Sequence, residues 1–113
     1  MTDLLSLSAR QCAELFARKQ ASPVDLLDAV LKRLDAVEPE VNAFVVVDRE
    51  RARRAAEESA DRHARGAAIG PADGLIGTIK DNVMVQGLPN RRGTRTSVDT
   101  PSPEDSPATA RLR

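Results

Sequence analysis

The chain has 113 residues, enough for one domain with a modest hydrophobic core. Its 17 basic and 17 acidic residues balance, so no long-range positive field is available to attract DNA or RNA, and we expect no nucleic-acid partner. No segment approaches the roughly 20 consecutive apolar residues of a membrane span, so we expect no membrane partner either.

Cysteine and histidine, two residue types that can act as nucleophiles or metal ligands, each occur once in the sequence. Cys12 falls in a helical pattern, and we interpret it as a small buried hydrophobe rather than a nucleophile. A lone cysteine forms no internal disulfide, and the N-terminus has no basic region followed by an apolar stretch, so we expect a cytoplasmic protein. His63 lies among arginines and alanines, where a solvated side chain is favoured over a ligand. With no cluster of metal-binding residues, no metal site is expected.

Residues 1–40 are predicted to form a helical lead-in. Ser8 opens a capping box that predicts the start of a first helix. A second helix is predicted to start at Pro23, because Ser22 is a good N-cap and proline suits the first helical position. This helix is expected to end at Pro39, since proline disfavours helical backbone in the residue before it.

Residues 41–85 are predicted to form a βαβ unit. The continuous β-branched and aromatic run at 41–47 is typical of a strand buried on both faces, and 75–79 is a second short strand. Between them a helix over about 49–65 is closed by Gly66. A parallel strand pair joined by a right-handed crossover predicts an α/β fold class.

Residues 86–113 are predicted to form a long loop followed by the start of a helix. The loop, 86–105, is rich in Gly, Pro, Ser, Thr and Arg, and loops of this length are usually functional or disordered. Ser106 and Pro107 then predict a helix that the sequence leaves short. Because two buried strands also need flanking strands, we expect the chain to be the leading piece of one larger α/β domain with a mixed sheet.

Lys80 is the strongest candidate for a catalytic residue. It follows the predicted strand at 75–79, so its side chain would project from the tip of a buried strand. A lysine with the ordinary pKa of about 10.4 is protonated, but burial disfavours the charged form of an amine. A neutral amine can take a proton from a hydroxyl group and so activate it as a nucleophile. The alternative is a surface lysine paired with Asp81.

A small basic cluster lies in the loop that follows, at Arg91, Arg92 and Arg95. One interpretation is a contact to a carboxylate or a phosphate. The other, which we favour, is an exposed loop in which the arginines pair with neighbouring carboxylates. Those carboxylates are Asp99, Glu104 and Asp105.

The order and spacing of several motifs resemble the amidase signature family. The family's Lys-Asp-Asn stretch stands here at 80–82, and its Gly-Leu-Pro segment at 87–89. The other matching segments are 22–27, 42–45, the alanine-rich helix after it, Gly70 with Pro71, Gly74 with Leu75, 93–95 and 104–113. The resemblance covers essentially the whole chain but only the first part of the family's domain.

This resemblance implies a hydrolase that cleaves carboxamide C–N bonds. In the family, a lysine at the position of Lys80 works with a serine held by a cis peptide bond, and together they activate a second serine that attacks the amide carbonyl. Both serines would lie beyond Arg113, so this chain alone is expected to be inactive. The resemblance implies no metal or organic cofactor and a small-molecule amide substrate for the complete protein. The N-terminal helices are the candidate surface for a homodimer.

The chain departs from the family's pattern at a few positions. Ile76 stands where proline is usual, and Arg91 and Arg92 stand where small or hydroxyl residues are commoner. These differences affect how the Lys80 side chain is positioned and which substrate the complete protein would bind. Two alternatives stay open at this point. One is a non-catalytic helical interaction module, and the other is a fragment of the amidase subunit of a tRNA-dependent amidotransferase.

Overall fold

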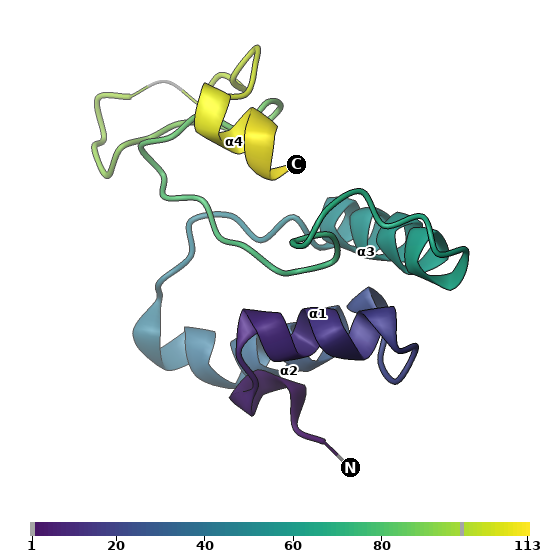
Figure 1. The fold of residues 1–113 in the computed structure, drawn as a ribbon. Coiled ribbons are helices and arrows are strands. Elements are labelled where there is room, and N and C mark those ends of the chain that lie inside the picture. Colours follow the sequence, from purple (N-terminus) through teal and green to yellow (C-terminus); the bar gives the residue numbers. More distant parts are fainter. Residues whose placement is uncertain (1, 98) are drawn as a thin grey trace. The chain divides into compact units, whose positions relative to one another are not determined.

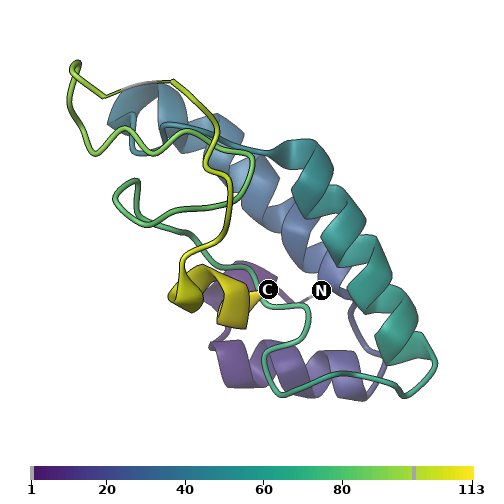
Figure 2. The same ribbon diagram turned by 90° about the horizontal axis from the view of Figure 1, so that it is seen from above.

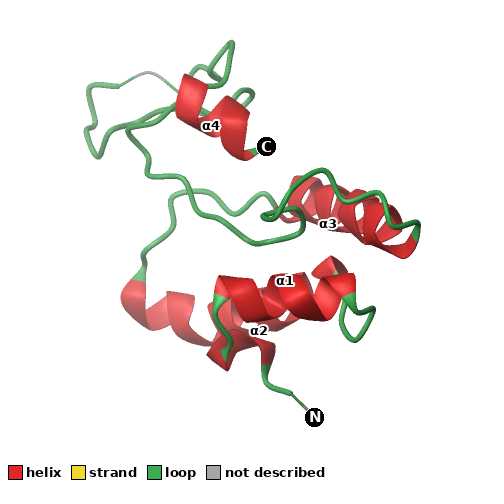
Figure 3. Ribbon diagram, in the orientation of Figure 1, coloured by secondary structure: helices red, strands yellow, loops and turns green. Residues whose placement is uncertain are grey.

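The structure is a computed structural model that describes residues 2–97 and 99–113. The described residues form helices joined by loops, with no extended strand among them (Figure 3). The chain divides into two compact units, Met1–Ile76 and Gly77–Arg113. The elements are the 3-10 helix η1 (Leu4–Ser6) and the helices α1 (Ala9–Ala17), α2 (Pro23–Val41), α3 (Arg49–Ala64) and α4 (Pro107–Leu112).

The starts of α1 and α2 follow the sequence prediction. Ser8 accepts a hydrogen bond from the backbone N–H of Gln11, and the Gln11 side chain accepts one from the backbone N–H of Ser8. A second capping box forms at Ser22 and Asp25, with Pro23 at the first helical position of α2. These caps satisfy N–H groups that a helix start otherwise leaves without partners.

The predicted end of α2 at Pro39 is wrong. The helix runs on to Val41 and ends at Asn42, which has a left-handed backbone with φ 46°. Proline removes only one intrahelical hydrogen bond, and this loss is small so close to a helix end. Asparagine tolerates the left-handed conformation better than most residues, so it supplies the stop that proline did not.

Three helices build the core of the first unit. Cys12 and Phe16 of α1 pack with Leu26 of α2, and all three side chains are buried. Helix α3 lies along α2, as Figures 1 and 2 show, and buries Ala56 and Ser59. The interpretation of Cys12 as a buried hydrophobe is therefore confirmed.

The structure does not form the two strands predicted at 41–47 and 75–79, so the βαβ unit is not confirmed. The backbone after α2 is irregular, and its apolar side chains stay exposed, with Val45 at 55% and Phe44 at 39%. A strand needs a neighbour to satisfy its N–H and C=O groups, and none lies beside these segments among the described residues. What the structure does establish is a helix-rich chain.

The second unit is organised by contacts between its loop and α4. Gly87 and Leu88 exchange backbone hydrogen bonds with Ser102, which joins the two ends of the predicted loop. Ser106 precedes α4 as predicted, but its hydroxyl accepts from the N–H of Met84 and makes no cap hydrogen bond. A side-chain contact distant in sequence has replaced the expected local cap.

Candidate functional site

Lys80 lies in a turn of the second unit and is exposed to solvent. The turn is closed by a hydrogen bond of 2.9 Å from the N–H of Val83 to the carbonyl oxygen of Lys80. Within residues 2–97 and 99–113, the Lys80 ammonium has no hydrogen-bond or ion-pair partner, so the surface pair with Asp81 does not form. Burial of the amine, on which its proposed chemistry depends, is therefore not achieved within the second unit itself.

Asp81, the next residue, connects the Lys80 turn to residues 91 and 92. Its carbonyl oxygen accepts from the N–H of Arg92 at 3.1 Å, and its Oδ1 accepts from the N–H of Arg91 at 3.3 Å. The other carboxylate oxygen, Oδ2, is buried and has no hydrogen-bond partner among the described residues. Asp81 thus uses both its backbone and its side chain to hold a segment ten positions further along the chain.

The segment that Asp81 holds is a tight turn with an unusual backbone. Arg92 and Gly93 have φ values of 54° and 69°, and the N–H of Thr94 donates to the carbonyl oxygen of Arg91 at 3.1 Å. Positive φ at both central residues is the pattern of a type I′ turn. Glycine adopts it freely, whereas arginine there costs about 1–2 kcal/mol. The surrounding contacts must hold Arg92 in place.

A second set of contacts holds the chain on the other side of the Lys80 turn. Met84 donates its N–H to Ser106 Oγ at 3.0 Å. Its carbonyl oxygen accepts from the N–H of Ser106 at 3.0 Å and from the buried Thr109 hydroxyl at 2.8 Å. Hydrogen bonds therefore hold the Lys80 turn at Asp81, within it, and at Met84, directly after it, whereas the Lys80 ammonium makes no hydrogen bond or ion pair within the part of the chain that the structure describes.

One member of the arginine cluster, Arg91, pairs with a neighbouring carboxylate as the favoured interpretation expects. Arg91 forms an ion pair with Asp99 at 2.9 Å, and both side chains are well exposed. Asp105 forms an ion pair with Arg113 at 2.9 Å. Exposed pairs of this kind contribute little to stability, at about 0–1 kcal/mol.

The sequence interpretation missed a polar cluster around Asp73 in the first unit. The Asp73 side chain is 2% exposed, and Arg62 donates to it twice, at 2.8 and 2.9 Å. Ser59 Oγ and the N–H of Ile69 supply two more hydrogen bonds, at 2.6 and 3.1 Å. The hydrogen bonds from Arg62, helped by those from Ser59 and Ile69, hold the pKa of Asp73 well below its ordinary range.

His63 joins this cluster and is not simply solvated. Its ring packs against Phe16 with centroids 5.5 Å apart, and its Nε2 lies 2.9 Å from the carbonyl oxygen of Asp73. Because a carbonyl oxygen only accepts, Nε2 carries the proton. The side chain therefore supports the core and binds backbone, which gives it a structural role.

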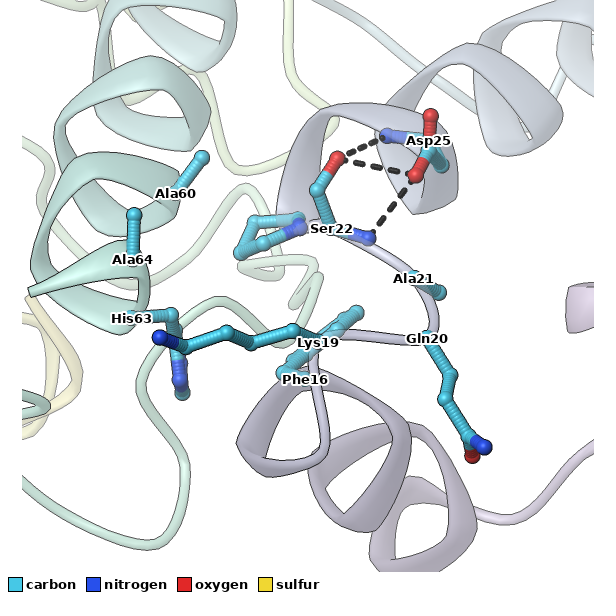
Figure 4. A pocket seen from close by; sticks show the side chains of 10 residues that line it. Phe16, Lys19, Gln20, Ala21, Ser22, Asp25, Ala60, His63 and Ala64 are labelled. Carbon is cyan, nitrogen blue, oxygen red and sulfur yellow. Dashed lines mark hydrogen bonds between the residues drawn. The ribbon is translucent and has the colours of Figure 1, made fainter. Parts of the chain in front are cut away.

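A shallow hollow of about 290 Å³ lies where α1 ends and α2 begins, beside the last turns of α3. Figure 4 shows the Lys19 side chain extending from the end of α1 towards His63 and Ala64. Ser22 and Asp25 at its rim bond each other in the α2 capping box. The hollow therefore offers the Lys19 ammonium and the His63 imidazole, which is already bound to backbone. These two groups do not form a combination that could catalyse a reaction.

Metal-binding and membrane-spanning features are both missing from residues 2–97 and 99–113. This part of the chain contains no group of three His, Cys, Asp or Glu side chains placed to hold a metal ion. None of its helices combines the length and apolar character that crossing a bilayer requires.

Comparisons with known proteins agree on the family. The family model described as Amidase matches residues 25–113. A glutamyl-tRNA(Gln) amidotransferase subunit from Salinispora tropica is 40% identical over 113 residues, which are all of this chain and 23% of that protein. The acylamidase of Rhodococcus erythropolis is 36% identical over 107 residues, which are 95% of this chain and 22% of that protein.

A third relative, from Roseiflexus castenholzii, is the same kind of glutamyl-tRNA(Gln) amidotransferase subunit and is 39% identical over 113 residues. The chain thus spans about a quarter of the length of the curated relatives it matches. The matched region contains Lys80, Asp81 and the turn that Asp81 holds. Because the family model covers more than half of its residues, the chain belongs to the amidase family.

Proposed function

We propose that residues 1–113 form the leading part of an enzyme that hydrolyses carboxamide C–N bonds, with Lys80 as the base. The observation that carries this proposal is the family match over 25–113, which includes Lys80. Only a proton acceptor would come from this chain, and the nucleophilic and bridging serines would come from further polypeptide. By itself the chain would therefore be inactive.

The exposure of Lys80 supports this division of labour. Its ammonium is solvated and free of partners among the described residues. An amine accepts a proton only in its neutral form. Polypeptide packed over the Lys80 turn would exclude water and favour the neutral form. Hydrogen bonds of Asp81 and Met84 would thus hold the Lys80 turn in place before further polypeptide packs over it.

The α/β architecture belongs to the same proposal. Residues 41–47 and 75–79 would become strands once neighbouring strands supply hydrogen bonds. The exposed apolar side chains of Phe44, Val45 and Val46 support this, because they gain from burial on a sheet face.

The substrate, the cofactor requirement, the cellular location and the oligomeric state are also part of the proposal. The substrate would be a small-molecule amide, and the serine–lysine chemistry would need no cofactor. A cytoplasmic location is supported by the single cysteine, Cys12, which is buried as a free thiol. A homodimer through the N-terminal helices remains a proposal.

The test uses a chimera in which this chain replaces the matching 107-residue segment of the Rhodococcus erythropolis acylamidase. With an amide that the unmodified acylamidase hydrolyses, we expect activity from the chimera. Lys80→Ala should lower kcat by about 100-fold or more, since a positioned base contributes that much. Lys32→Ala, an exposed lysine on α2, is the matched control and should keep full activity. An active Lys80→Ala chimera would refute the role of Lys80.

A second candidate function is that of an amidotransferase subunit, favoured by the names of the Salinispora and Roseiflexus relatives. The two functions differ in the amide consumed and in the need for partner subunits. A chimera with the Salinispora tropica protein, measured together with its partner subunits, separates them. Transamidation there, together with no hydrolysis in the acylamidase chimera, would favour the second candidate.

A further inference from the structure

We propose that Asp81 is a positioning residue that fastens the 91–94 turn to the Lys80 turn, which gives one wall of the amide site its shape. This inference rests on the proposed function of Lys80. It assigns a role to a residue that need not touch substrate. Its basis is the pair of hydrogen bonds from residues 91 and 92 to Asp81, directly after Lys80 in the chain.

The backbone conformation of Arg92 explains why the turn needs these hydrogen bonds. Its φ of 54° lies in the left-handed region, which disfavours a long side chain. Backbone strain of this kind persists only where surrounding contacts over-determine the conformation. Asp81 supplies two such contacts, one from its carbonyl oxygen and one from its carboxylate.

The carboxylate has no other task that the described residues reveal. Among them Asp81 forms no ion pair, and its second oxygen is buried without a hydrogen-bond partner. A buried carboxylate oxygen left in this state is unfavourable, so the group is not explained by stability alone. A role in shaping the turn explains why the carboxylate faces Arg91.

The first test uses the 113-residue chain and needs no activity. In a ¹⁵N-labelled sample, the temperature coefficients of the amide protons of Arg91 and Arg92 report their hydrogen bonds. Asp81→Ala should change the Arg91 coefficient directly, by removing its carboxylate acceptor, and the Arg92 coefficient through release of the turn. Asp99→Ala should leave both unaltered, because the ion pair of Asp99 is with the Arg91 side chain. Unaltered coefficients in Asp81→Ala would overturn the proposal. This result is independent of whether the proposed function is right.

The second test uses the acylamidase chimera. Asp81→Ala should lower kcat by roughly 10- to 100-fold with a smaller change in KM, as expected for a displaced reacting group. Adding Arg92→Gly should restore most of the lost kcat, because glycine adopts a positive φ without supporting hydrogen bonds. Arg92→Gly alone is the reference for the double variant. A wild-type kcat in Asp81→Ala, or a loss that Arg92→Gly does not relieve, would overturn the proposal.

Discussion

At the scale of single residues, Asp73 shows how one carboxylate secures a loop to a helix. It binds Ser59 and Arg62 of α3 through its side chain, while the N–H of Ile69 donates to it from the loop. Next to it, Gly74 has a φ of 91°, and a Cβ there would lie 2.5 Å from Pro23 Cγ. The close approach and the backbone conformation both require glycine, so this pair of residues fixes the loop against α2 and α3.

We predict that Asp73→Asn destabilises the first unit by about 2–3 kcal/mol, because hydrogen bonds from a charged donor to a buried carboxylate are replaced by weaker ones. Urea unfolding followed by helical circular dichroism measures the change. Asp61→Asn is the matched control, since Asp61 pairs with Arg65 at the surface and is 68% exposed. Its loss should stay below about 0.5 kcal/mol. Equal effects from the two variants would contradict the role of Asp73.

The same carboxylate predicts a pH dependence. The folded-state pKa of Asp73 is depressed, chiefly by hydrogen bonds from Arg62, so its contribution is present above the unfolded value of about 3.9. The free energy of unfolding should therefore fall as the pH drops below that value, because the unfolded chain then binds a proton at Asp73 more readily than the folded protein does. In Asp73→Asn this part of the acid dependence should be missing. A sequence pattern could not reveal this, because the Arg62–Asp73 pair joins residues of a helix and a distant turn.

At the scale of elements, the sequence predicted the starts of α1 and α2 and the end of α3, but neither the end of α2 nor the absence of the two strands. The capping boxes of α1 and α2 involve residues three apart, so a short stretch of chain is enough to predict them. The end of α3 is also local: Gly66, with φ 68°, ends it as predicted. The predicted strands at 41–47 and 75–79 would need neighbouring strands distant in sequence, and the described residues do not provide them.

The segment at 41–47 provides a test at this scale. In the 113-residue chain, Val45→Lys should change stability by less than about 0.5 kcal/mol, because Val45 is 55% exposed. In the acylamidase chimera the same variant should be destabilised by about 3 kcal/mol or more, since it would bury an unpaired charge. Ala55→Lys on the exposed side of α3 is the control and should be tolerated in both. If Val45→Lys is equally harmless in both proteins, the segment does not become a buried strand.

At the scale of the whole molecule, the chain divides into two units that are stabilised in different ways. The first, Met1–Ile76, is a three-helix assembly with its own small core. The second, Gly77–Arg113, has little regular structure and is held by hydrogen bonds around the Lys80 turn. Lys80 and its motif were identifiable from the sequence, but its exposed position was not, because the exposure of a side chain depends on which distant parts of a protein pack against it.

The most direct test of the central claim compares Lys80→Arg with the unmodified chain in the acylamidase chimera. Arginine keeps the positive charge but cannot give up its proton, so it separates a base from a fixed charge. If the amine of Lys80 accepts a proton, kcat should fall by about 100-fold or more, as with Lys80→Ala. Lys32→Arg should have no effect. Retention of most of the activity by Lys80→Arg would contradict the account.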